Sequence, residues 1–201
     1  MYTIVGLGNP GGEYASTRHN AGRIVARLLA EKGKVALKEK KKPDHAVGMG
    51  EVLGEKVRIV LPDTYMNNSG KAILPYIKSA AAAKKLVVVH DEIDLPLGVV
   101  RVSFGSSSGG HNGLKSVERA VKTKNYIRIR IGVSKAGKRG AKKPVGEKAV
   151  LAHILGKFPK GDLETLTDSI AKRVFLALET LFDTNDPVMA MNAVNGLPPV
   201  S

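Results

Sequence analysis

The tetrapeptide Leu86-Val87-Val88-Val89 constrains the fold more than any other segment of the sequence. A strand with one solvated face alternates apolar and polar residues, whereas this segment is apolar throughout and rich in β-branched valine. We therefore expect a strand that is buried on both faces, near the centre of a sheet. Such a strand requires a packed layer on each side of that sheet.

Strand-like and helix-like segments alternate along the rest of the chain. Short apolar runs predict strands at residues 2–5, 46–53, 56–61, 99–104 and 127–133. Helical spacing predicts helices at residues 21–32, 69–83, 112–122, 162–182 and 188–194. Asn20 is the candidate N-cap of the first helix, and Pro75 is expected to lie early in the second or to kink it. The alternation predicts an α/β fold, a three-layer sandwich with a central mixed, twisted β-sheet flanked by helices.

A single domain is expected to span residues 1–201, because no long Pro/Ser/Gly linker interrupts the chain and 43% of its residues are hydrophobic. Two basic segments lack periodicity. Residues 38–43 predict a solvated loop, and residues 134–148 predict a mobile basic loop.

The net charge of +14 is unevenly distributed. Residues 162–201 contain six acidic and two basic side chains, a net charge of −4, so the residues before them carry +18. This asymmetry favours a polyanionic partner such as nucleic acid, although a lysine-rich surface that only aids solubility explains the charge equally well. With only four Phe and five Tyr, we expect recognition of the phosphate backbone rather than stacking on single-stranded bases.

The chain has no cysteine, no apolar run near 18 residues and no charged-then-apolar leader. Disulfides and thiolate chemistry are thereby excluded, and we expect a cytoplasmic protein with no membrane partner.

Four blocks contain the residues suited to chemistry: Val5 to Asn20 (VGLGNPGGEYASTRHN), Thr64 to Gly70 (TYMNNSG), His90 to Pro96 (HDEIDLP) and Gly109 to Ser116 (GGHNGLKS). In order and approximate spacing they resemble the bacterial-type peptidyl-tRNA hydrolases, over about residues 2–193. The resemblance implies hydrolysis of the ester between the peptide and the terminal ribose of peptidyl-tRNA. It also implies a monomer that needs no cofactor and has peptidyl-tRNA as its partner.

His19 is the candidate general base, because a neutral imidazole titrates near working pH and can take a proton from an attacking water. From the residues alone, a histidine beside Arg18 is more often polar surface, and Asp91 or Asp94 could merely cap loop amides. The resemblance implies instead that His19 activates water and that Asp91 orients its ring.

Three asparagines, in three different blocks, are the candidate substrate ligands. A side-chain amide can donate to a developing oxyanion and accept from a peptide N–H, although an Asn beside Pro or Gly usually serves a turn. The resemblance implies that Asn9 and Asn67 hold the peptide end and the reacting carbonyl, and that Asn112 acts from the rim. It further implies that Met66 lines an apolar wall and that Tyr14 shapes the same cleft.

The tRNA contacts are also expectations from the resemblance. Arg101 and Arg130 are expected to receive the 5′-phosphate, although Ser103 stands where a Lys or Arg is common. A loop with five basic residues is expected to follow the acceptor stem, although it lacks the usual Gly-Pro turn: Lys135, Lys138, Arg139, Lys142 and Lys143.

Other motifs suggest weaker alternatives. Gly6 to Gly11 matches the dinucleotide fingerprint G-x-G-x-x-G, but Pro10 and the long turn that follows it disfavour nucleotide binding. The segment from Gly105 to Gly109 matches G-x-S-x-G and leaves open a serine esterase that uses Ser107.

His90 and His111 with Asp91 lack tight metal-ligand spacing, so no metal is expected. A non-catalytic RNA-binding relative is the second hypothesis. It needs the basic surface but not the complete set of candidate site residues.

Overall fold

Strand β5 (Leu86–Pro96) lies inside the sheet and pairs in parallel with β1 on one side and β7 on the other. Its residues alternate between two hydrophobic cores: Leu86 and Val88 belong to one, and Val87 and Val89 belong to the other. The central strand that the apolar tetrapeptide predicts is therefore confirmed in this computed structural model, which describes residues 1–138 and 140–200.

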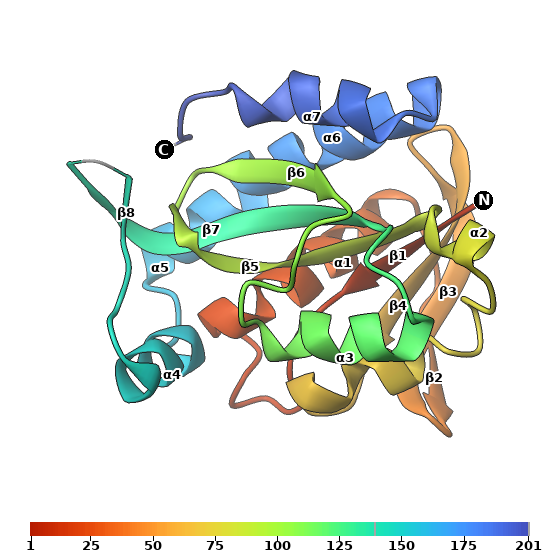
Figure 1. The fold of residues 1–201 in the computed structure, drawn as a ribbon, viewed down its shortest axis with the longest axis horizontal. Helices are drawn as coiled ribbons and strands as arrows, with labels where there is room; N and C mark the ends of the chain where they lie inside the picture. The colour runs from red at the N-terminus through yellow and green to blue at the C-terminus, as the bar shows by residue number, and fades with distance from the viewer. Residues whose placement is uncertain (139, 201) are drawn as a thin grey trace.

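The sheet is mixed and twisted, with strand order β2-β3-β4-β1-β5-β7-β6 and with β8 paired to β7 (Figure 1). Strands β1, β4, β5 and β7 run in parallel, whereas β2, β3, β6 and β8 pair antiparallel with their neighbours. The remaining strands are β1 (Tyr2–Gly6), β2 (Lys38–Lys41), β3 (Asp44–Val52), β4 (Glu55–Pro62), β6 (Val100–Phe104), β7 (Ile127–Gly137) and β8 (Gly140–Lys142).

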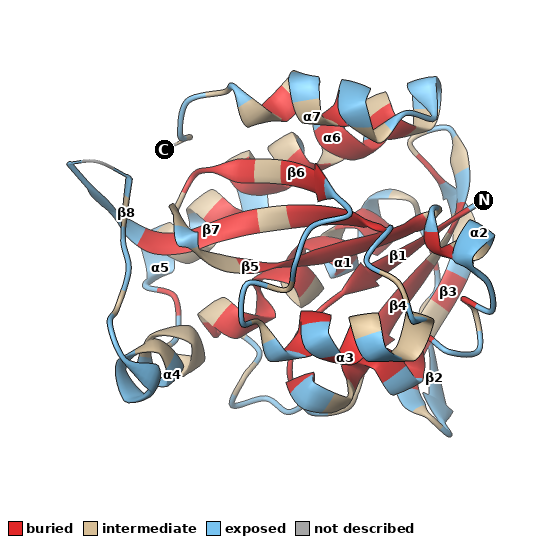
Figure 2. Cartoon of the chain, in the orientation of Figure 1, coloured by how far each residue is buried: buried red, intermediate tan, exposed pale blue. Residues whose placement is uncertain are grey.

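Helices cover both faces of the sheet, and the red, buried strands lie between them in Figure 2. One face packs against α1, α6 and α7, and the other packs against α3 and the 3₁₀ helix η2. The helices are η1 (Arg18–Asn20), α1 (Ala21–Lys32), η2 (Met66–Ala72), α2 (Ala80–Ala83), α3 (Asn112–Val121), α4 (Glu147–Leu155), α5 (Lys160–Thr165), η3 (Leu166–Ile170, a π-helix), α6 (Ala171–Thr184) and α7 (Pro187–Asn195). The three-layer α/β prediction is confirmed.

Three predicted segments differ from the structure. Residues 38–43 are not simply a loop, because Lys38–Lys41 pairs with β3 as an exposed edge strand whose charges suit a sheet edge. The helix predicted at residues 69–83 is replaced by η2, a turn and the short helix α2. Pro75 has no amide N–H with which to continue a helix, and the Ser79 side chain caps α2 by accepting from Ala82 N.

The segment 134–148 is also more regular than predicted. Strand β7 continues to Gly137, β8 pairs back onto it, and α4 begins at Glu147. Among the described residues, no helix is long and apolar enough to cross a bilayer.

Candidate active site

His19 lies in η1, between the glycine-rich turn after β1 and the start of α1, and only 6% of it is exposed. The two ends of this turn are joined by Asn9 and Asn20. Asn20 Oδ1 accepts from Asn9 N at 2.8 Å, and Asn20 Nδ2 donates to Asn9 O at 3.0 Å. Asn20 occupies the N-cap position of α1, as the sequence predicts, but its side chain makes no capping bond to the helix because its amide closes the turn.

Asp91 lies in β5, directly after the apolar segment, and its carboxylate accepts from two imidazoles. His19 Nδ1 lies 2.9 Å from Oδ1 and 3.0 Å from Oδ2, and His111 Nε2 lies 3.0 Å from Oδ1. The three side chains come from η1, β5 and the N-cap position of α3. The fold thus brings together residues that are 20 and 72 positions apart from Asp91 in sequence.

The hydrogen bonds determine which ring nitrogens carry protons. His111 Nδ1 accepts from Gly113 N at 3.1 Å and from Leu114 N at 3.4 Å, so its proton is on Nε2 and points to Asp91. His19 in turn donates from Nδ1, which leaves Nε2 as a lone-pair acceptor in the neutral ring. Among the described residues, none forms a hydrogen bond with His19 Nε2.

The pKa shifts agree with a charged carboxylate that stabilises a protonated imidazole. Burial lowers the pKa of His19, but the charge and hydrogen bond of Asp91 more than offset this, so the pKa is raised overall. Burial also raises the pKa of Asp91, yet His19 and His111 hold it well below its ordinary value.

The neighbouring His90 has a different state. It is buried and donates from Nδ1 to Asp91 O at 2.7 Å, while its Nε2 has no partner among the described residues. Burial, together with the charges of His111 and Arg128, lowers the pKa of His90 to about 3, so this ring is neutral.

A cavity of about 310 Å³ opens beside His19 and Asp91. Asn112 lines it, as do the three residues before His111 and an apolar wall from α4: Ser108, Gly109, Gly110, Val150, Leu151 and Ile154. The α4 wall was not predictable from the sequence, because the segment lacks a clear apolar stripe and none of its residues is buried.

Asn9 and Met66 are in contact but lie to one side of this cavity. Asn9 Oδ1 accepts from Met66 N at 2.9 Å, and a Cβ added at Gly113 would lie 2.5 Å from Met66 Sδ, so three of the four sequence blocks meet here. Asn9 lines a separate hollow of about 490 Å³ against α1. Asn67 is exposed and Tyr14 is half-buried, and neither lines the His19 cavity.

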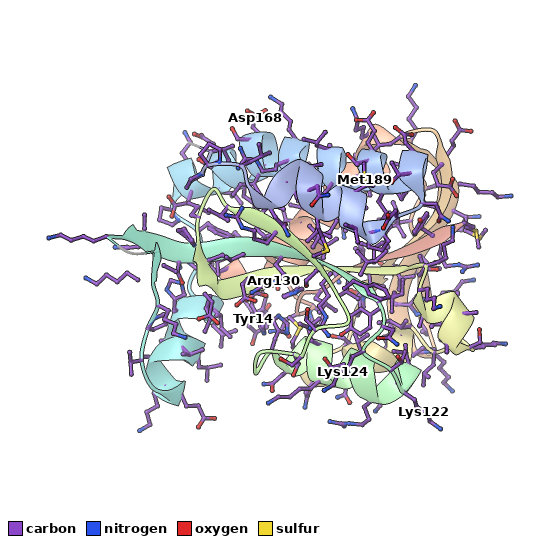
Figure 3. The ribbon with its side chains drawn as sticks, turned by 45° about the horizontal axis from the view of Figure 1, so that its top comes forward. Tyr14, Lys122, Lys124, Arg130, Asp168 and Met189 are labelled. Carbon is purple, nitrogen blue, oxygen red and sulfur yellow. The ribbon has the colours of Figure 1, made fainter. Side chains whose placement is uncertain are left out.

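The two arginines expected to bind phosphate already have acceptors. Arg130, near the middle of the molecule in Figure 3, donates from Nε to Glu92 at 3.1 Å. Arg101 lies opposite Arg130 in the register of β6 and β7. Its Nη1 donates to the carbonyls of Val194 and Leu197, at 3.5 and 3.4 Å. Both side chains therefore already donate to protein acceptors and would have to release them to bind a phosphate.

The β7–β8 hairpin projects from the body of the protein (Figure 1). Four of the basic residues expected to follow the acceptor stem lie on it or just after it: Lys135, Lys138, Lys142 and Lys143. Lys135, Lys138 and Lys142 are exposed, and Lys143 pairs with Asp94 at 2.6 Å. Arg139 lies outside the described residues.

The geometry disfavours the alternative motifs. After Gly6 ends β1, α1 begins only at Ala21, so no helix opens at the glycines as dinucleotide binding requires. The loop from Gly105 to His111 separates β6 from α3, so Ser107 does not stand on a sharp strand-to-helix turn.

His19, Asp91 and His111 could converge on a metal ion, since their ligand atoms lie within 4.8 Å of one another. A histidine that binds a metal ordinarily donates from its other ring nitrogen. His111 Nδ1 instead accepts from two backbone amides, so these donors fit a proton rather than a metal at Nε2.

Known proteins of a single family resemble this chain in both sequence and structure. The family model described as "Peptidyl-tRNA hydrolase" matches residues 3–199. A protein of that name from Syntrophotalea carbinolica is 39% identical over 196 residues, covering 97% of each chain. One from Acinetobacter baumannii is 38% identical over 197 residues, covering 98% of this chain and 96% of its own. The crystal structure of peptidyl-tRNA hydrolase from Acinetobacter baumannii superposes with a TM-score of 0.85 at 36% identity, covering 100% of this chain and 97% of that one.

Proposed function

Because this chain belongs to the peptidyl-tRNA hydrolase family, we propose that it cleaves the ester between the peptide and the terminal ribose of peptidyl-tRNA through a water molecule activated by His19. The products are the free peptide and a tRNA that can be used again. We further propose that it acts as a monomer, as the resemblance to this family implies.

The observation that carries the mechanism is the orientation of the His19 ring. Asp91 binds Nδ1–H, so the basic Nε2 is the atom left to meet a water in the cavity. As the water oxygen attacks the ester carbonyl, Nε2 takes its proton, and the Asp91 carboxylate stabilises the resulting imidazolium. The imidazolium then returns a proton to the departing ribose oxygen, and no covalent intermediate is required.

The asparagines are proposed to bind the substrate around that centre. Asn112 is exposed at the cavity and can donate to the carbonyl oxygen as negative charge develops. Asn9 uses Oδ1 to hold Met66, which leaves its Nδ2 to donate to a peptide carbonyl. Asn67, Met66 and Tyr14 are proposed to extend this surface along the peptide.

The tRNA is proposed to lie along the β7–β8 hairpin. Lys135, Lys138 and Lys142 are exposed there, and the exposed Lys143–Asp94 ion pair is weak enough to open for a phosphate. Arg139 is included in this proposal only because of its position in the sequence. Arg101 and Arg130 would receive the 5′-phosphate only by exchanging their present acceptors for it.

Replacement of the base tests the mechanism. His19→Ala should lower the rate of peptide release from a peptidyl-tRNA by about 10² or more, as loss of a general base commonly does. His45→Gln is the control, because His45 lies on β3 and bonds Tyr76 away from the cavity. Circular dichroism checks folding. Turnover by His19→Ala close to that of the wild type would refute the role of His19.

The class of substrate needs its own comparison. We expect rapid release from a peptidyl-tRNA, and little from an aminoacyl-tRNA with a free amine or from a plain aryl ester. Labelling by a serine-directed reagent, with loss of activity, would instead support the Ser107 esterase alternative.

A further inference from the structure

The segment from Gly105 to Gly110, here called the Gly105–Gly110 loop, has no regular secondary structure and packs little against the rest of the protein. It joins β6 to α3, and most of its residues are exposed. Gly105, Gly109 and Gly110 have φ angles of +67°, +57° and +89°, a region in which glycine is the least strained residue. Yet the end of this loop, Ser108 to Gly110, forms one wall of the cavity that contains His19.

A buried arginine holds the start of the loop. Arg128 lies on β7 and is 2% exposed. Its Nη1 donates to Ser107 O and its Nη2 donates to Ser106 O. Nη2 also donates to Glu118 Oε1 on α3 at 2.9 Å, so one guanidinium connects the sheet, the helix and the loop.

This arrangement depends on the shape of arginine. Burial of a cation is unfavourable unless its charge is offset and its donors are bonded. Glu118 offsets the charge, and Nη1 and Nη2 are bonded, whereas the buried Nε has no partner among the described residues. The guanidinium also lies over the Tyr126 ring, with its carbon 4.7 Å from the ring centre. Lysine has the same charge but no planar fork, so it cannot bond both carbonyls and Glu118 in this geometry.

We propose that Arg128 is a positioning residue that fixes the Gly105–Gly110 loop as a wall of the cavity and thereby sets the affinity for the peptide part of the substrate. Arg128 does not line the cavity and acts through the loop. The reacting groups are held independently, because His111 is fixed by Asp91 and by the amides of Gly113 and Leu114. The proposal rests on the function proposed above, and it assigns substrate binding rather than the chemical step to this residue.

The main test is Arg128→Lys, with hydrogen exchange and steady-state kinetics measured on the same preparation. Amides of residues 106–110 should exchange faster, while those of β7 and α3 stay as protected as before. KM for a peptidyl-tRNA should rise about tenfold, the factor that loss of one ordinary hydrogen bond produces, with kcat changed less than about threefold. The matched control is Arg119→Lys, an exposed arginine of α3, which should alter neither measurement.

A second variant separates the hold on the loop from the ion pair. Glu118→Gln removes the negative charge but leaves both carbonyls bound to Arg128, so loop exchange and KM should stay near their wild-type values. The proposal is overturned if Glu118→Gln loosens the loop as much as Arg128→Lys does, or if Arg128→Lys leaves loop exchange or KM unchanged. Exchange rates do not depend on activity, so this failure is distinguishable from an active His19→Ala, which would refute the catalytic proposal alone.

Discussion

Asp91 is the residue on which the state of the site depends, because one carboxylate accepts from both His19 and His111. The amides of Gly113 and Leu114 force the proton of His111 onto Nε2, so His111 serves as a fixed donor to Asp91. Oδ1 is therefore held from the α3 side while His19 approaches from η1. Burial lowers the pKa of His19, but the charge and the hydrogen bond of Asp91 together outweigh it, so the pKa is raised overall.

Asp91→Asn should change the pH dependence of hydrolysis as well as its rate. Activity requires neutral His19, so kcat/KM should rise with pH through a pKa above the ordinary histidine value. Without the carboxylate charge, burial lowers the pKa of His19, and the acid limb should move to lower pH while the maximum rate falls. The measurement is kcat/KM for a peptidyl-tRNA from pH 5 to 9. An acid limb that stays in place would mean that a group other than His19 titrates there.

His19 and Asp91 were predictable from the sequence only through a family resemblance, not through spacing, and their roles stay proposals. From the sequence, His111 was a candidate only as a metal ligand. The reason is physical: the proton position on His111 depends on two backbone amides in the first turn of α3, and no residue pattern encodes that contact. The two hydrogen bonds between the Asn20 side chain and the Asn9 backbone were not predictable for the same reason.

Helix α4 shows how an element can belong to the cavity without belonging to the core. None of its residues is buried, and two contacts of His153 tie it to the rest of the protein. Its carbonyl accepts from Arg18 Nη1 at 3.5 Å, and its Nε2 donates to Val133 O on β7 at 3.0 Å. Because Arg18 directly precedes His19, one of the two contacts of this helix lies beside the candidate base.

Leu151→Ser should weaken binding of substrates whose peptide carries apolar side chains. Leu151 is 52% exposed beside the cavity, so its surface is available for a ligand to cover. We expect KM to rise about tenfold, because full burial of a leucine side chain contributes roughly 1.5 to 3 kcal/mol and a ligand covers part of it. The kcat should be unchanged.

The control is Leu176→Ser on α6, a leucine that is 42% exposed and does not line the cavity. Equal KM values for Leu151→Ser and the wild type, with apolar and polar peptides alike, would remove α4 from the peptide site.

At the level of elements, the apolar strands were predictable because burial on both faces leaves a continuous signal in the sequence. The segments whose structure was predicted wrongly lack such a signal. Strand β2 is charged and owes its conformation to its tertiary partner, β3. The helix expected at residues 69–83 is instead broken by local features, since η2 ends at Ala72, Pro75 follows it and Ser79 caps α2.

The acidic and basic side chains of the whole molecule gather in different elements. The acidic segment from Asp162 onward forms α5, η3, α6 and α7, and α6 and α7 cover the face of the sheet opposite α3. The β7–β8 hairpin projects beyond the other elements (Figure 1), and its lysines are exposed. We therefore expect a polyanion to be repelled by α6 and α7 and attracted to the hairpin. The hairpin lies near the cavity, because Lys143 pairs with Asp94, directly after the cavity-lining Ile93.

Salt dependence separates local docking from general attraction. Replacing Lys135, Lys138 and Lys142 together by alanine should lower the slope of log kcat/KM against log salt by up to about 2 to 3, since each phosphate contact on a duplex contributes roughly 0.9. The matched variant replaces Lys38, Lys40 and Lys41 on β2, three exposed lysines on a strand at the other end of the sheet order. Both variants lose three positive charges, so a general attraction would change both slopes equally. A hairpin that docks the acceptor stem would change only the first, and equal slopes would exclude it.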